Sequence, residues 1–181
     1  MKKGKLKGLL ILVLVLIAVT ACGSVYAYMI KQTNITNNFT PAKVSCEVEE
    51  KTDNPVTEKS SITVKNTSNI DAYLRVRLVS YWVKDAGAGT YVVGKESVMP
   101  TFTIKDDWIA GSDYTYYYKS PVAPGDDTKE LLDSKIVLAA DGEYLQVVEV
   151  FAEAIQSEPS KAVTESWGLT LDANGLITGA P

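Results

Sequence analysis

The sequence predicts an all-β fold: an antiparallel β-sandwich of jelly-roll-like or immunoglobulin-like type with one short helix. Three observations support this prediction. Short segments in which apolar and polar residues alternate recur from about residue 44 onward, clusters of Gly, Pro, Asn and Asp separate them, and only one segment has helical spacing. No internal repeat is visible.

The first half of the domain contains the strongest strand signal. Expected strands cover residues 44–48, 60–65, 72–83 and 90–93. In the longest of them (AYLRVRLVSYWV), Leu74 and Val76 fall on one face, and Arg75 and Arg77 fall on the other. This period of two residues is typical of a strand that has one buried and one solvated face.

The second half continues in the same pattern. Expected strands or extended pieces cover residues 102–104, 114–119, 136–139 and 144–155, and a loop is expected to begin at 106–108. Residues 160–167 (SKAVTESW) form the one expected helix, in which Ser160 is a candidate N-cap and Val163 and Trp167 share a face. Alternation then resumes, followed by a turn at 172–175 (DANG).

The first 27 residues have the layout of a secretion signal. Four lysines precede the uncharged apolar stretch 9–21, and small residues follow as far as Val25-Tyr26-Ala27. This layout predicts cleavage between Ala27 and Tyr28. We therefore divide the chain into 1–27, a signal peptide or membrane anchor, 28–41, an extended N-terminal segment, and 42–181, the β-sandwich domain.

Two other outcomes of export remain open. The apolar stretch extends toward Ile30 if it is retained as an uncleaved membrane anchor. Alternatively, Val19-Thr20-Ala21-Cys22-Gly23 resembles a lipobox, in which Cys22 carries a lipid. The expected location is extracellular or at the cell surface, with attachment to the membrane if this segment is retained or lipidated.

The charge balance excludes one class of partner. The formal net charge is −4, and removal of residues 1–27, with four lysines and no acidic residue, makes it −8. An acidic chain without a basic stripe is not expected to bind nucleic acid.

The residue types also limit the chemistry. The chain contains no histidine, which excludes Ser-His-Asp and Cys-His catalytic sites and imidazole metal ligands. Cys46 is the one cysteine after the signal, and we interpret it as a buried strand residue, with an intermolecular disulfide as the alternative. We expect no enzymatic activity and no cofactor.

Two acidic pairs in expected loops remain as site candidates: Asp106 with Asp107, and Asp126 with Asp127. Neighbouring loop acids are usually solvated turn residues. They are also candidates for a calcium site, because hard cations prefer carboxylate and carbonyl oxygens. A hydrolase that uses these acids is a further alternative.

An aromatic block follows the first acidic pair: Trp108, Tyr114, Tyr116, Tyr117 and Tyr118. We expect these side chains mainly to pack inside the sandwich. The alternative is a contact face for carbohydrate or protein.

Several segments together carry a resemblance to a known family. They are Ala27-Tyr28, TNNFTP at 36–41, NTSNIDAYLRV at 66–76, Asp107-Trp108, YYYK at 116–119, Pro124-Gly125, AEAIQ at 152–156, and Ala162-Val163 through Trp167-Gly168. In these segments the chain resembles the TasA- and camelysin-like proteins of Gram-positive bacteria.

The resemblance implies a jelly-roll-like sandwich that a dedicated signal peptidase processes during export. It also implies a surface or biofilm-matrix protein whose partners are itself or related matrix subunits. Camelysins were described as metalloproteases, but this chain has neither histidine nor an HExxH motif, so that activity is not carried over.

A physical route to fibres follows from the predicted fold. Sandwiches have edge strands with unpaired backbone groups, and the segment 28–41 can be donated to such an edge in the next subunit. Head-to-tail donation does not close and therefore builds filaments. The alternatives are that 28–41 is only a spacer, and that the chain is a membrane- or lipid-anchored binding module.

Overall fold

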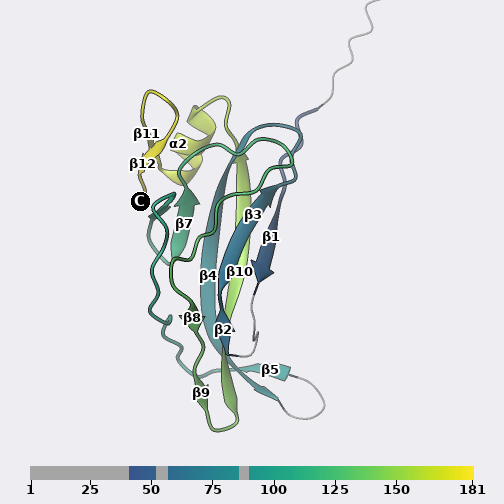
Figure 1. Ribbon diagram of the computed structural model, residues 1–181, viewed down its shortest axis with the longest axis vertical. Coiled ribbons are helices and arrows are strands. Elements are labelled where there is room, and N and C mark those ends of the chain that lie inside the picture. The colour runs from purple at the N-terminus through teal and green to yellow at the C-terminus, as the bar shows by residue number, and fades with distance from the viewer. Residues whose placement is uncertain (1–40, 52–56, 86–89) are drawn as a thin grey trace, which may run out of the picture. The chain divides into compact units, whose positions relative to one another are not determined.

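The two longest strands form the centre of the larger sheet. The computed structural model describes residues 41–51, 57–85 and 90–181 (Figure 1). Strands β4 (Ala72–Asp85) and β10 (Tyr144–Gln156) pair antiparallel from Gln156↔Ala72 to Tyr144↔Lys84. The sheet order is β6-β7-β4-β10-β9, and β5 also pairs with β4. The other members are β5 (Thr90–Val93), β6 (Trp108–Ala110), β7 (Thr115–Tyr118) and β9 (Ala140–Asp141).

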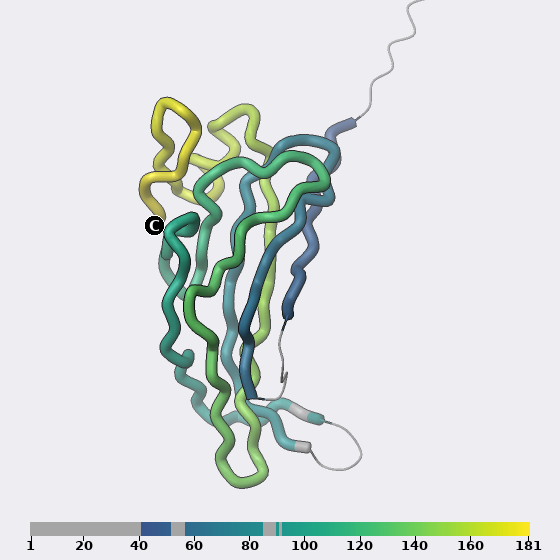
Figure 2. The backbone as a smooth tube through the Cα atoms, in the orientation of Figure 1, coloured from purple at the N-terminus to yellow at the C-terminus, as the bar shows by residue number. Residues whose placement is uncertain are grey.

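The second layer is built on β3 (Ser61–Asn66). On one side β3 pairs antiparallel with β1 (Cys46–Lys51). On its other side the segment 125–131 runs alongside: Thr128 N donates to Val64 O at 2.9 Å, and Leu131 N donates to Ile62 O at 2.9 Å. The path continues through β2 (Glu58–Lys59), which pairs with β8 (Ile136–Val137) (Figure 2).

The main core lies between these layers, where alternating residues of both sheets meet. Ile62 and Val64 of β3, Leu74 and Val76 of β4, and Val148 of β10 are fully buried. By contrast, on the opposite face of β4, Arg75 is half-buried and Arg77 is exposed. The all-β antiparallel fold and the predicted faces of the longest strand are thus confirmed.

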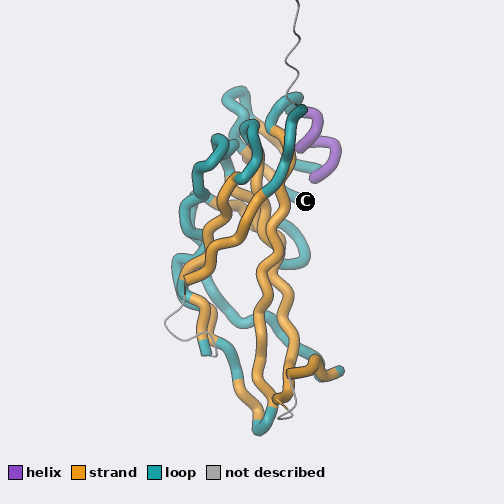
Figure 3. The backbone as a smooth tube through the Cα atoms, turned by 90° about the vertical axis from the view of Figure 1, so that its right-hand side faces the viewer, coloured by secondary structure: helices purple, strands orange, loops and turns teal. Residues whose placement is uncertain are grey.

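A smaller cluster covers the outer face of the larger sheet at one end. Helix α2 (Lys161–Trp167) and the hairpin of β11 (Thr170–Leu171) and β12 (Ile177–Gly179) lie there (Figure 3). Val163, Trp167 and Ile177 pack against Tyr73 and Tyr117. The expected helix is confirmed, but Ser160 makes no side-chain capping bond.

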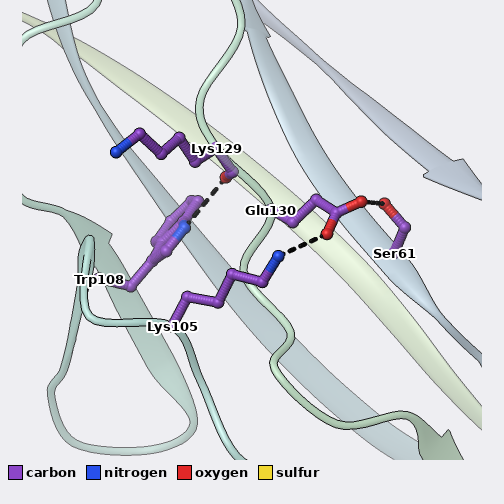
Figure 4. A network of polar contacts seen from close by, with 5 residues as sticks. All are labelled: Ser61, Lys105, Trp108, Lys129 and Glu130. Atoms are coloured by element: carbon purple, nitrogen blue, oxygen red, sulfur yellow. Dashed lines mark hydrogen bonds and ion pairs between the residues drawn. The ribbon is translucent and has the colours of Figure 1, made fainter.

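The region around Trp108 corrects one prediction. Residues 106–108 were expected to begin a loop, but Trp108 begins β6 and pairs with Tyr118. Its indole is buried, and Nε1 donates to Lys129 O at 3.1 Å (Figure 4). Cross-strand packing and this hydrogen bond therefore override the loop-forming character of the preceding acids. Conversely, residues 102–104 form no regular strand and contribute a single bridge, Ile104↔Leu132.

The described residues from Ala42 to Pro181 form one compact unit. The candidate processing positions Cys22, Ala27 and Tyr28, and the segment before Pro41, lie outside the described residues. Within the described ranges, no helix has the length and apolar character needed to cross a membrane.

Candidate functional site

The outer edge of β1 exposes backbone hydrogen-bonding groups. Thr67 N donates to Ser45 O at 3.1 Å, so the backbone of Ser45 faces β3. Because successive residues of a strand point their backbone groups to opposite sides, those of Cys46, Val48 and Glu50 face away from β3. Among the described strands, β3 is the sole hydrogen-bonded neighbour of β1.

The edge of β10 that faces away from β4 is longer than the outer edge of β1. Hydrogen bonds to neighbouring segments again show which of its backbone groups point outward. Ser157 N donates to Asp71 O at 3.0 Å, which continues the bonding toward β4, whereas Gln146 N donates to Ala139 O on the other side at 2.9 Å. The backbone groups of residues 148, 150, 152 and 154 therefore point away from β4. The short strand β9 pairs only with Tyr144 and Leu145, and no other described strand extends this edge.

These two edges lie on the same side of the sandwich. Strand β1 lies beside β10 (Figure 1). Their core-facing side chains are only partly buried: Cys46 and Val48 of β1, and Val150, Ala152 and Ala154 of β10. The two edges thus combine small apolar side chains with outward backbone groups. An added strand requires both features.

Cys46 is part of this apolar margin. Burial raises the pKa of its thiol, and the charge of Glu153 raises that pKa further. Since the thiolate is the reactive form, the thiol is held in its less nucleophilic state at neutral pH. This environment fits the packing interpretation of Cys46 better than the disulfide alternative.

The first acidic pair is engaged in local contacts. Asp107 Oδ1 lies 2.7 Å from Lys129 Nζ, and Lys119 N donates to Asp107 O at 3.0 Å. Asp106 is exposed just before β6. These contacts join the start of β6 to the end of β7 and to the neighbouring segment of the second layer.

Asp126 and Asp127 are exposed beside β3. Asp126 O accepts from Asn66 N at 2.9 Å, and Asp127 forms a bridge with Lys65. Across the described ranges, no three acidic or cysteine side chains gather closely enough to hold a metal ion. Calcium binding by these acids stays a hypothesis.

The aromatic block divides between the interior and the surface. Tyr116 and Tyr117 are buried, Trp108 and Tyr118 make an edge-to-face contact at 5.2 Å between ring centroids, and Phe102 contacts Tyr116 similarly at 5.7 Å. The packing interpretation is confirmed for these residues. Tyr114, however, is 50% exposed.

A hollow with a volume of about 800 Å³ lies near α2 and the β11–β12 hairpin. Asp71, Glu158 and Asp172 line it together with hydroxyl side chains, and no basic residue does. The Asp172 carboxylate accepts the N–H groups of Asn174 and Leu176 at 2.8 Å, so its role is to hold its own turn.

Comparison with models of protein families gave no match, and neither did comparison with curated proteins or with solved structures.

The sequence alone did not identify the edges of β1 and β10 as the candidate site. The runs 46–51 and 144–156 contain alternating residues that predict strands, but alternation does not tell which strands lie at an edge. One signal was present: Ala152 and Ala154 are small residues at inward positions of an otherwise bulky strand.

Proposed function

We propose that the protein is an exported, non-enzymatic structural subunit of a cell surface or extracellular matrix, which assembles by donating its N-terminal segment to the next copy. The observation that carries this proposal is the pair of open edges, β1 and β10, on one side of the sandwich. The resemblance to matrix proteins supports the same function.

The composition of segment 28–41 suits a donated strand. In an extended conformation, Ile35 and Phe39 lie on the same face, because their separation is an even number of residues. That face would cover the half-buried Val150 and Ala152, while the backbone of the donated segment pairs with the outward groups of β10.

Charge favours the same contact. Segment 28–41 contains Lys31 and no acidic residue, whereas residues 42–181 contain all 22 acidic residues and 13 of the 18 basic ones. A cationic segment is therefore attracted to a domain of formal charge −9. This attraction is expected to weaken as salt is added.

Strand donation gives a direction to the assembly. The donor segment precedes β1, so each copy offers one segment, and β10 is the edge that accepts the segment of another copy. Such a contact is heterologous, and repeated contacts build filaments where the rotation between successive copies does not close a ring.

Electron microscopy of the protein processed at Ala27 tests this function. The processed chain should form filaments, and a chain that begins at Ala42 should remain monomeric. Monomers of the processed chain at high concentration would contradict the proposal.

A single substitution on the acceptor edge sharpens the test. Ala152→Pro removes an N–H that faces away from β4, so no hydrogen bond between β10 and β4 is lost. This variant should fold but fail to assemble, whereas the matched control Ala152→Ser should form filaments. Normal filaments from Ala152→Pro would exclude β10 as the acceptor.

The second candidate function is a surface binding module that is anchored through Cys22 or a retained apolar helix. The exposed side chain of Tyr114 favours this candidate, because it leaves part of the aromatic block available to a ligand. The mature N-terminus separates the two candidates, since an anchored module keeps a lipid on Cys22 or an intact Met1.

A further inference from the structure

We propose that the outer face of the larger sheet around Arg77 binds a neutral sugar ring of a polysaccharide chain. This site lies on the face of the sheet and uses neither open edge, so it goes beyond the assembly function.

The backbone beside this face is strained. Thr115 N donates to Ser112 O at 3.0 Å and closes a turn whose two central residues, Asp113 and Tyr114, have φ of 52° and 55°. Asp tolerates this left-handed conformation, but a bulky aromatic residue rarely adopts it. Tyr114 occupies a backbone conformation that glycine adopts more easily, and its side chain is half exposed. This combination indicates that the tyrosine has a role other than stabilising the fold.

Other exposed side chains continue the surface from Tyr114 across the sheet. Arg77 is directly opposite Phe151 of β10 and Thr115 of β7 in the strand register. Phe151 is 48% exposed and Val79 is 37% exposed. The face therefore offers the exposed ring of Phe151 beside Arg77, and Tyr114 lines a second hollow that Arg77 also lines.

Two hollows meet at Arg77 and Asp113, which line both of them. One has a volume of about 180 Å³ and also includes Ser112, Thr115 and Phe151. The other has a volume of about 320 Å³ and includes Tyr114 and Val79. Adjacent hollows that share two polar side chains suit consecutive units of a polymer better than one compact ligand.

The polar side chains that line the two hollows can hydrogen-bond neighbouring hydroxyl groups of a sugar ring. A guanidinium presents several N–H donors in a fixed plane, a carboxylate accepts through two oxygens, and Ser and Thr hydroxyls do both. Arg75 is already paired with Glu153 and stacked on Trp167. Arg77 has no side-chain hydrogen bond or ion pair among the described residues, so its donors are available.

Charge selects a neutral sugar over an anionic one. The smaller hollow is lined by two arginines and two acidic residues, so its charges balance. The surrounding domain has a formal charge of −9 and repels polyanions. Phe151 then supplies an apolar ring against which the C–H face of a sugar packs.

Isothermal titration calorimetry with defined hexasaccharides tests this site. The probes are hexamers of β-1,4-linked glucose, β-1,3-linked glucose and N-acetylglucosamine, with a galacturonic acid hexamer as the anionic probe. The protein is the chain that begins at Ala42, which lacks the donor segment, so that filament formation and sugar binding are measured separately. At least one neutral hexamer should bind.

Arg77→Ala and Phe151→Ala should each weaken that binding by about tenfold, since each removes a direct contact. The controls Lys161→Ala and Leu176→Ala, at exposed positions on α2 and on the β11–β12 turn, should bind as the parent does. Tyr114→Gly should raise the melting temperature and still weaken binding, which a purely structural residue would not do.

Three results would overturn the proposal: no binding of any neutral hexamer, binding of the galacturonic acid hexamer alone, or full affinity in Arg77→Ala and Phe151→Ala. Each of these results leaves the assembly function untouched.

Discussion

Arg75 and Glu153 face each other across β4 and β10, with Arg75 Nη2 2.6 Å from Glu153 Oε2. The same guanidinium lies over the Trp167 ring, with Cζ 4.6 Å from its centroid. One side chain thus joins the two central strands to α2 on the outer face of the sheet.

Arg75→Ala should therefore lower the free energy of unfolding by roughly 1–2 kcal/mol, through loss of the ion pair and of the cation–π contact. Urea denaturation of the chain that begins at Ala42 measures this change. The matched control is Arg77→Ala, two residues along the same strand, which should change stability by under about 0.5 kcal/mol. Equal effects of the two substitutions would contradict this role of Arg75.

Tyr114→Gly should stabilise the fold by about 1 kcal/mol, because glycine adopts a φ of 55° without the clash that a Cβ causes. Thermal and urea unfolding measure the change. Asp113→Gly is the comparison: its gain should be smaller, since Asp tolerates the left-handed region. A loss of stability in Tyr114→Gly would show that packing of the tyrosine outweighs the strain.

The contacts of Glu130 predict a pH-dependent contribution to stability. The pKa of this carboxyl is lowered because Lys105 and Ser61 hydrogen-bond the carboxylate, and because of the charge of Lys105 (Figure 4). A lowered pKa in the folded state contributes stability above the usual glutamate pKa, and this stability is lost as the pH falls through the folded value.

Glu130→Gln should consequently destabilise the protein at pH 7, by at most about 1 kcal/mol because the side chain is largely solvated, and the difference should be smaller at pH 3 than at pH 7. Urea midpoints at both pH values measure it. Glu165→Gln, an exposed change on α2, should leave the midpoint unchanged at either pH. An effect of Glu130→Gln that grows in acid would contradict the assignment.

The mature N-terminus of the protein isolated from its host should be Tyr28, because the Val25-Tyr26-Ala27 pattern precedes it. Mass spectrometry of the intact protein identifies it. A lipidated Cys22 or an intact Met1 would instead support the anchored binding module.

The sequence predicted the strands that have clear alternation. In β4, Leu74 and Val76 are buried and Arg77 is exposed, as the period of two requires. Helix α2 was predictable because Val163 and Trp167 are one turn apart. Short strands were missed where long-range pairing decides the structure: β6 exists because Trp108 packs against Tyr118, and β2 exists because it pairs with β8.

The candidate surfaces were less predictable, for a related reason. Sequence periodicity shows that Val150 and Phe151 face opposite sides of β10. It does not show that, among the described strands, only β9 pairs with the outer edge of β10, at Tyr144 and Leu145. Nor does it show that Arg77 stands between Phe151 and Thr115. Both features depend on strand order, which is set by contacts between distant segments.

Hydrogen–deuterium exchange at the outward amides of β10 tests the central claim most directly. In the processed protein, the N–H groups of Val148, Val150, Ala152 and Ala154 should exchange at least about tenfold more slowly than in the chain that begins at Ala42, because a donated strand accepts them. Equal exchange rates in the two proteins would show that nothing completes this edge, and would contradict assembly by strand donation.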